Sequence, residues 1–240
     1  MPVLAVCLLA SAGQVEAACS ALNAAGQNYT VCSFEPDKTR LEVFNLDYSG
    51  EPYRYFSALQ RELSADGKTL RFAMNAGMFD TNQRPIGLYI EDGQQTKKLN
   101  RRNGGGNFHL KPNGVFFIKD GKPEVMETEA YMRANVRPEF ASQSGPMLVV
   151  GGKIHPKFSP TGLSRKIRNG VGIDGDGVAH FVISDSAVTF YEFATLFSDE
   201  LACDNALFFD GSISGLFAPE INRNDGFLPL GPMVGAYEIK

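Results

Sequence analysis

Tryptophan is absent from the 240-residue chain, and histidine occurs only three times. A metal centre built on several histidine ligands has few residues to draw on, and stacking against a sugar ring would fall to tyrosine or phenylalanine. Basic residues are not in excess either, because 23 Lys and Arg face 27 Asp and Glu, giving a net charge of -4. A nonspecific nucleic-acid ligand needs such an excess to release counterions from phosphates. We therefore expect no nucleic-acid partner.

Several well-known site motifs are also missing. None of the four cysteines is spaced as CxxC, and no HExxH, GxSxG or phosphate-loop sequence occurs. Residues 170–175 match GxGxxG, but a dinucleotide site needs a helix after its glycines, and a hairpin is predicted there. We expect no cofactor and no resident metal ion.

Beyond the N-terminus, the sequence has no apolar run long enough to span a membrane. Residues 3–12 are apolar but too short to cross a bilayer, and residues 15–17 loosely fit a processing site. We interpret residues 1–18 as a signal peptide that lacks the usual basic start; the alternative is a buried N-terminal strand or helix. The remainder, residues 19–240, is then a single domain that is periplasmic or secreted.

The cysteines fit an oxidising compartment. Cys7 lies in the predicted signal, and Cys19 and Cys32 would then close a small loop, stabilising the fold by roughly 2–4 kcal/mol. Cys203 is left without a partner. The alternative is that all of the cysteines are free thiols.

The 25 glycines and 13 prolines predict many turns, which favours a strand-rich fold over a helical bundle. Helices are expected over 55–66 and 189–201, where apolar residues recur at helical spacing. The fold class is therefore α+β, with one mixed, strand-rich sheet and two or three helices. Strands are expected over 29–34, 41–46, 70–74, 86–90, 115–119, 124–127, 147–150, 171–174, 178–184, 206–209 and 233–239, with the first two on either side of a turn at 35–38.

Three of these strands lie next to small polar clusters, which is a common way to build a site because glycine lets the backbone approach a ligand closely. Each cluster also has a structural alternative, since Asp-Gly is ordinary turn chemistry, residues 75–77 could be a helix-like turn, and Arg168 could be a surface charge. The clustered residues are Asn75 and Gly77 after the first strand; Arg168, Asn169 and Asp174 around the second; and Asp210, Gly211, Ser212 and Ser214 after the third.

The order of these clusters resembles the phosphodiester glycosidase family, that of the lysosomal uncovering enzyme, and especially its bacterial periplasmic branch. Residues 75–79 (NAGMF) are similar to the family's NGGFF-type motif, with Ala76 and Met78 as departures. Residues 168–174 (RNGVGID) are similar to its Arg…Gly-Ile-Asp motif. Residues 209–214 (FDGSIS) follow its LDGGGSS motif more loosely, and residues 144–148 (SGPML) are similar to the segment before the central motif. The resemblance runs from about residue 30 to the C-terminus.

The resemblance implies hydrolysis of a sugar-1-phosphodiester, and the partner is then a carbohydrate phosphodiester. Arg168 would clamp the phosphate through its guanidinium, and Asp210 or Asp174 would stabilise an oxocarbenium-like state or activate water. Together these three are the candidate catalytic residues. No residue pattern predicts an oligomeric state. The candidate substrate-binding residues are Asn75, Gly77, Ser144, Asn169, Gly211 and Ser212.

Two other hypotheses compete with hydrolysis by Arg168, Asp174 and Asp210 acting without a metal ion. The first is a non-catalytic periplasmic protein that binds a glycan or a partner through an eroded site, because the last motif has lost glycines. The second is a metal-assisted phosphodiesterase that uses Asp174, Asp176 and Asp210 as oxygen ligands. Arg101 and Arg102, near the glycine-rich residues 103–108, would attract an anionic glycan or be solvated surface charges.

Overall fold

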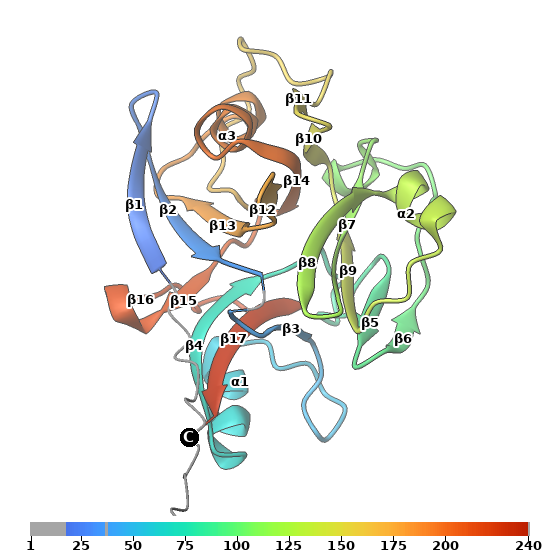
Figure 1. Ribbon diagram of the computed structural model, residues 1–240, viewed down its shortest axis with the longest axis vertical. Helices are drawn as coiled ribbons and strands as arrows, with labels where there is room; N and C mark the ends of the chain where they lie inside the picture. The colour runs from blue at the N-terminus through green and yellow to red at the C-terminus, as the bar shows by residue number, and fades with distance from the viewer. Residues whose placement is uncertain (1–17, 37, 240) are drawn as a thin grey trace, which may run out of the picture.

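The computed structural model describes residues 18–36 and 38–239 (Figure 1), and strand dominates over helix in this part of the chain. The predicted signal peptide lies almost wholly outside the described residues. The strands form three sheets rather than one. In spatial order, the first sheet consists of β1 (Ala18–Ala24), β2 (Gln27–Phe34), β13 (Ala179–Ser184), β12 (Asn169–Asp174), β14 (Cys203–Asp210), β10 (Met147–Val150) and β11 (Lys153–Ile154).

The other two sheets have five strands each. The second consists of β16 (Arg223–Asn224), β15 (Leu216–Ala218), β4 (Lys68–Asn75), β17 (Met233–Ile239) and β3 (Leu41–Phe44). The third consists of β6 (Gln94–Lys97), β5 (Tyr89–Glu91), β9 (Phe140–Ser144), β7 (Gly114–Lys119) and β8 (Lys122–Glu127).

The expected mixed sheet is wrong, because every strand pairing in the described part of the chain is antiparallel. Short hairpins join β5 to β6, β7 to β8 and β12 to β13, and such turns connect only antiparallel neighbours. β2 and β3 lie on either side of the predicted turn, as expected, but they do not pair with each other. β2 pairs with β1 and β13, whereas β3 pairs with β17 in another sheet.

The expectation of two or three helices is confirmed, since the described residues contain α1 (Phe56–Ala65), α2 (Thr128–Ala134) and α3 (Phe190–Thr195). The buried face of α1 carries Phe56, Leu59 and Leu63, as its apolar spacing predicts. A capping box between Thr189 and Glu192 starts α3, and a π turn, η2 (Leu196–Glu200), continues it. The short 3₁₀ turns are η1 (Asn107–His109) and η3 (Pro219–Ile221). None of the described helices is both long and apolar enough to cross a bilayer.

A shared aromatic core holds the three sheets together. The ring of Phe181 on β13 lies 5.7 Å from that of Phe34, 5.1 Å from that of Phe72 and 5.7 Å from that of Phe116. These partners belong to β2, β4 and β7, so one cluster joins all three sheets, and each of the four side chains is buried. Burying such a side chain stabilises the fold by about 1.5–3 kcal/mol. Strand ends from different sheets are thereby held in fixed positions beside one another.

The expected disulfide between Cys19 and Cys32 is confirmed, and the two residues face each other directly across β1 and β2. Cys203 is a buried free thiol. Because the bond closes a loop with a sequence separation of 13, replacing both cysteines by serine is expected to lower the free energy of unfolding by about 3 kcal/mol. Urea unfolding of the two proteins measures this difference. A Cys203→Ser variant, which breaks no disulfide, is the control, and equal stability of wild type and double variant would contradict the expectation.

Candidate functional site

Antiparallel pairing brings two of the predicted polar clusters together. β12 begins where β14 ends, so Asn169 faces Asp210 across the ladder. The backbone N–H of Asp210 donates to the Asn169 side-chain oxygen at 3.2 Å. Arg168 immediately precedes β12, and the 211–215 loop immediately follows β14. The second and third clusters therefore meet at the end of the β12–β14 pair where β12 begins and β14 ends.

The first cluster joins them through two interlocked amides. Asn75 ends β4 in the second sheet, and its Nδ2 donates to the backbone oxygen of Ile213 at 2.9 Å. Its Oδ1 accepts from the backbone N–H of Gly215 at 2.9 Å and from Asn169 Nδ2 at 2.9 Å. Both asparagines are completely buried. They hold the 211–215 loop in place, and their side-chain amides form hydrogen bonds with other protein groups.

The 211–215 loop wraps around the Asp210 carboxylate. Oδ1 of Asp210 accepts from the backbone N–H of Ser212 at 2.8 Å, and the Ser214 hydroxyl donates to the Asp210 carbonyl at 2.9 Å. The side chain of Asp210 is largely buried, at 9% exposure, whereas Ser212 is exposed. Burial raises the pKa of Asp210 above its usual value, and backbone hydrogen bonds from Ser212 and Gly211 partly oppose this. The loop thus holds the largely buried carboxyl group of Asp210 next to Ser212, which is exposed to solvent.

Arg168 supplies a buried positive charge beside this loop. Only 1% of it is exposed, its Nε donates to the Val188 carbonyl at 2.9 Å, and its Nη2 donates to the Ser164 carbonyl at 3.0 Å. No carboxylate of the described residues forms a salt bridge with it. Desolvation by burial lowers the pKa of Arg168 to about 10, so the guanidinium is still charged at neutral pH.

The third nitrogen of the guanidinium, Nη1, lies towards Gly211. A Cβ atom at Gly211 would stand 3.6 Å from Nη1 and 3.0 Å from the ring of Phe208. Glycine at this position therefore lets the backbone lie close to the Phe208 ring and to the guanidinium. A buried cation without an acidic partner, next to a backbone with no side chain, is an arrangement suited to an anionic ligand.

Aromatic rings hold Arg168 in place. Its guanidinium carbon lies 3.6 Å from the ring centroid of Phe190 and 5.5 Å from that of Phe208. Phe158 stacks on Phe190, with the centroids 4.8 Å apart and the planes 6° apart. Such contacts stabilise a desolvated cation and fix the plane of its nitrogens. The sequence showed Phe190 only as an apolar position of a helix, because nothing in its spacing relates α3 to Arg168.

Two more predicted residues support the site from behind. Ser144 at the end of β9 is completely buried, and its hydroxyl donates to the Phe209 carbonyl at 2.8 Å. A Cβ atom at Gly77 would stand only 2.6 Å from the Ser142 hydroxyl, so glycine is required where the chain leaves β4. The structure thus gives Ser144, Gly77, Asn75 and Asn169 supporting positions, and their contact with substrate stays a prediction. Gly211 and Ser212 remain beside Arg168 and Asp210.

Asp174 does not join this cluster. It pairs with Cys203 at the far end of β12, five residues from Asn169, a distance of roughly 16 Å along a strand. Its carboxylate accepts from the backbone N–H groups of Asp176 at 3.0 Å and Val178 at 2.9 Å, and it bonds His180 Nε2 at 3.0 Å. Asp174 thus shapes the turn between β12 and β13. The structure therefore does not bring Asp174 together with Arg168 and Asp210, because neighbouring antiparallel strands end at opposite ends of the ladder.

The same geometry separates the three carboxylates of the metal-assisted hypothesis, since Asp174 and Asp176 lie in that distant turn. Within residues 18–36 and 38–239, no three His, Cys, Asp or Glu side chains are grouped so that they would hold a metal ion.

Comparisons with known proteins match this chain to a protein family. A family model described as phosphodiester glycosidase matches residues 68–228, a range that includes Asn75, Arg168 and Asp210. The uncharacterized protein YigE of Escherichia coli K12 is 38% identical over 191 residues, which cover 80% of this chain and 73% of that protein.

Two solved structures share the fold. The catalytic domain of zebrafish N-acetylglucosamine-1-phosphodiester alpha-N-acetylglucosaminidase, auto-inhibited by its pro-peptide, matches with a TM-score of 0.62 and 16% identity, over 92% of this chain and 82% of that chain. A hypothetical protein from Synechocystis matches with a TM-score of 0.58 and 15% identity, over 92% of this chain and 61% of that chain. At these identities the likeness concerns the fold alone.

Proposed function

Because the chain belongs to the phosphodiester glycosidase family, we propose that it is an exported hydrolase acting on a sugar-1-phosphodiester. The bond that breaks joins the anomeric carbon of the sugar to the phosphate oxygen. Water supplies a hydroxyl group to that carbon and a proton to the products, which are a free sugar and a phosphomonoester. A sugar linked in this way carries one negative charge at the phosphate.

The observation that carries the proposal is the unpaired Arg168 guanidinium beside the 211–215 loop. Nε and Nη2 are occupied by protein carbonyls, which leaves Nη1, on the Gly211 side, to bind a phosphate oxygen. The charge of the leaving phosphate does not need to be neutralised by protonation if this cation is in place. A strong general acid is therefore not required for departure of the phosphate.

Asp210 is the group proposed to act on the sugar carbon. As a carboxylate, it would stabilise positive charge that develops at that carbon, or deprotonate the attacking water. The proposal is supported by Gly211, which directly follows Asp210 and lies beside Arg168 Nη1. Ser212, which is exposed, is proposed to donate its hydroxyl to a sugar or phosphate oxygen.

Export is part of the proposal for two reasons. The apolar residues 3–12 fit a signal peptide, and the Cys19–Cys32 disulfide is a bond that persists in oxidising compartments. The substrate would then belong to a glycan of the cell envelope or the surroundings, and the protein would be periplasmic or secreted.

The test is release of sugar from synthetic sugar-1-phosphodiesters with a methyl group on the phosphate. N-acetylglucosamine is the first sugar to use, because the zebrafish enzyme acts on an N-acetylglucosamine-1-phosphodiester. Turnover of at least one sugar of the panel is expected. Tight binding of such a diester by calorimetry, with no turnover of any sugar, would instead support the non-catalytic glycan-binding alternative.

Phe190 is expected to act as a positioning residue for Arg168. Replacing Phe190 by leucine removes the ring at 3.6 Å, and we expect kcat/KM to fall about tenfold, the scale of a desolvated cation–π contact. Phe190→Tyr keeps the ring and should restore most of the activity. Phe193→Leu on the same helix is the control, because that buried ring packs on Tyr29 and Phe197 instead. Equal losses of kcat/KM in the two leucine variants would argue against positioning.

A further inference from the structure

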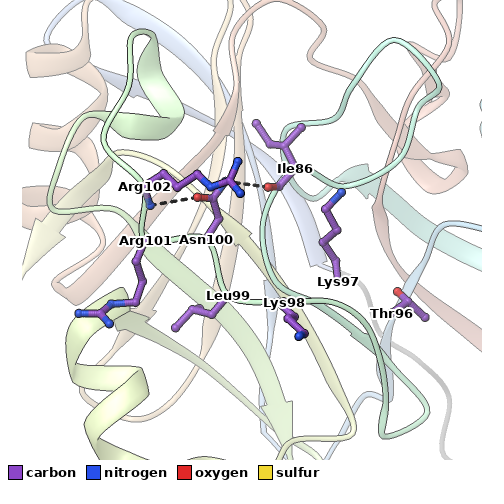
Figure 2. A pocket seen from close by; sticks show the side chains of 8 residues that line it. All are labelled: Ile86, Thr96, Lys97, Lys98, Leu99, Asn100, Arg101 and Arg102. Carbon is purple, nitrogen blue, oxygen red and sulfur yellow. Dashed lines mark hydrogen bonds between the residues drawn. The ribbon is translucent and has the colours of Figure 1, made fainter.

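Positive charge gathers in a pocket away from the 211–215 loop. The pocket has a volume of about 540 Å³ and lies where the chain leaves β6. Figure 2 shows Lys97 and Arg102 extending towards Ile86, while Arg101 points away. The lining residues are Ile86, Thr96, Lys97, Lys98, Leu99, Asn100, Arg101 and Arg102.

The charge of this pocket is not neutralised by its own lining. Four of the eight lining residues are basic and none is acidic. Arg101 is paired with Glu129, at 2.9 Å, but Lys97, Lys98 and Arg102 form no salt bridge with any described residue. All three are exposed. Three available cations thus share one concave surface on a chain with a net charge of -4.

Hydrogen bonds connect the lining of the pocket to the candidate site. Asn100 Nδ2 donates to the Ile86 carbonyl at 2.9 Å. The Gln143 side chain accepts from the Asn100 N–H at 2.8 Å and donates to its carbonyl at 2.9 Å. The next residue, Ser144, bonds the carbonyl of Phe209, immediately before Asp210. A short series of direct contacts therefore joins the pocket to the end of β14.

We infer that this pocket binds a second acidic group of an extended substrate, which makes the substrate a glycan chain with repeating phosphodiesters. This inference rests on the proposed function, because one sugar-1-phosphodiester has only the charge that Arg168 would bind. Ammonium and guanidinium groups of Lys97, Lys98 and Arg102 would attract the next phosphate along such a chain. The pocket lining has no aromatic residue on which a nucleic-acid base would stack, which favours a phosphate-containing glycan over a single-stranded nucleic acid.

The experiment measures binding of a glycerol-phosphate hexamer, a phosphodiester chain without bases, to the full chain by calorimetry. The pocket variant carries Lys97→Gln, Lys98→Gln and Arg102→Gln. Its affinity is expected to be about tenfold lower than that of wild type, with a weaker dependence on salt, because fewer counterions are exchanged. The control variant, Lys119→Gln, Lys122→Gln and Arg133→Gln, removes the same charge from exposed positions outside the pocket.

The control variant should bind the hexamer like wild type, and an equal loss in both variants would reduce the effect to net charge and overturn the inference. Tighter binding of a thymidine hexanucleotide than of the glycerol-phosphate chain would overturn it in favour of nucleic acid. Thermal unfolding checks that both variants fold, and the single Lys98→Gln substitution repeats the test if the triple variant does not. The measurement involves no turnover. A protein that binds the hexamer through the pocket but hydrolyses no sugar-1-phosphodiester would keep this inference and refute the proposed reaction.

Discussion

Replacing Asp210 by asparagine is expected to lower kcat/KM for a sugar-1-phosphodiester by a factor on the order of 10²–10⁴, the range of a lost catalytic carboxylate. Asparagine has nearly the same shape, and its side-chain oxygen can still accept from the Ser212 N–H, now 2.8 Å from Asp210 Oδ1. The loop is therefore expected to keep its conformation while the negative charge is lost. Steady-state kinetics of the two proteins on the same diester measures the loss. Turnover at the wild-type rate in a folded variant would remove Asp210 from the mechanism.

The same substitution is expected not to destabilise the fold. Burial raises the pKa of Asp210, so the folded state favours the protonated form more than the unfolded chain does, where the pKa is about 3.9. The resulting loss of stability is absent well below the unfolded pKa and is complete above the raised folded pKa. At pH 7 the asparagine variant should therefore have a Tm equal to or above that of wild type, and the difference should shrink as the pH falls towards about 4. A lower Tm at pH 7 would contradict this argument.

Asp174 provides a control for which the expected change in stability has the opposite sign. Although burial opposes it, hydrogen bonds from His180 and from the N–H groups of Val178 and Asp176 lower the pKa of Asp174. Its charged form therefore stabilises the fold above the unfolded pKa of about 3.9, and this contribution is lost as the pH falls through the lower folded value. Asp174→Asn should reduce Tm at pH 7 and leave kcat unchanged. The two aspartates, alike in sequence, are thus expected to separate function from stability.

Much of the fold could be predicted from local pattern. The helix at Phe56–Ala65 and the strands at Met147–Val150 and Met233–Ile239 agree with their expected ranges, because one face or both faces of each are apolar. β9 was missed. Its sequence, FASQS, is polar in three of five positions, yet every one of its residues is buried. It occupies the middle of the third sheet, where burial comes from neighbours that the local sequence does not reveal.

The polar clusters at strand ends could be predicted from the sequence, but their arrangement in space could be predicted only in part. Arg168 and Asp210 lie at the same end of the β12–β14 pair because Asn169 and Asp210 are register partners, and glycines and polar residues at strand ends indicated both. The separation of Asp174 from them has a simple cause, since a list of strand ends does not say which ends lie on the same side of a sheet. That information resides in the pairing direction, and residues far apart in sequence set it.

Arg168→Met is expected to have the second large effect, on both ligand binding and catalysis. Desolvation lowers the pKa of Arg168 to about 10, below its value in the unfolded chain. For a cation, this means that the buried charged form lowers the free energy of unfolding. The loss is complete at every pH well below the folded pKa, and therefore at pH 7. An anion bound at Nη1 would offset the penalty. Inorganic phosphate is therefore expected to raise the Tm of the wild-type protein.

The size of that rise follows from linkage, because phosphate at ten times its Kd stabilises the folded state by about 1.4 kcal/mol, or a few degrees in Tm for a chain of this length. Methionine has a similar length and no charge, so the variant should show no phosphate-dependent rise, together with a loss of turnover of about a hundredfold or more. Arg165→Met is the matched control. That side chain is 46% exposed and bonds Glu192 on the surface, so the rise should persist.

If Arg168→Met does not fold, because the carbonyls of Val188 and Ser164 lose their donors, Arg168→Lys keeps the charge in a conservative form. A single ammonium group cannot donate to both carbonyls and present a third nitrogen in one fixed plane over the Phe190 ring. We therefore expect the lysine variant to fold, to keep a reduced phosphate-dependent rise in Tm and to lose most of its turnover. A full rise in either variant would mean that phosphate binds elsewhere, and the unpaired guanidinium would then have no part in recognising the substrate.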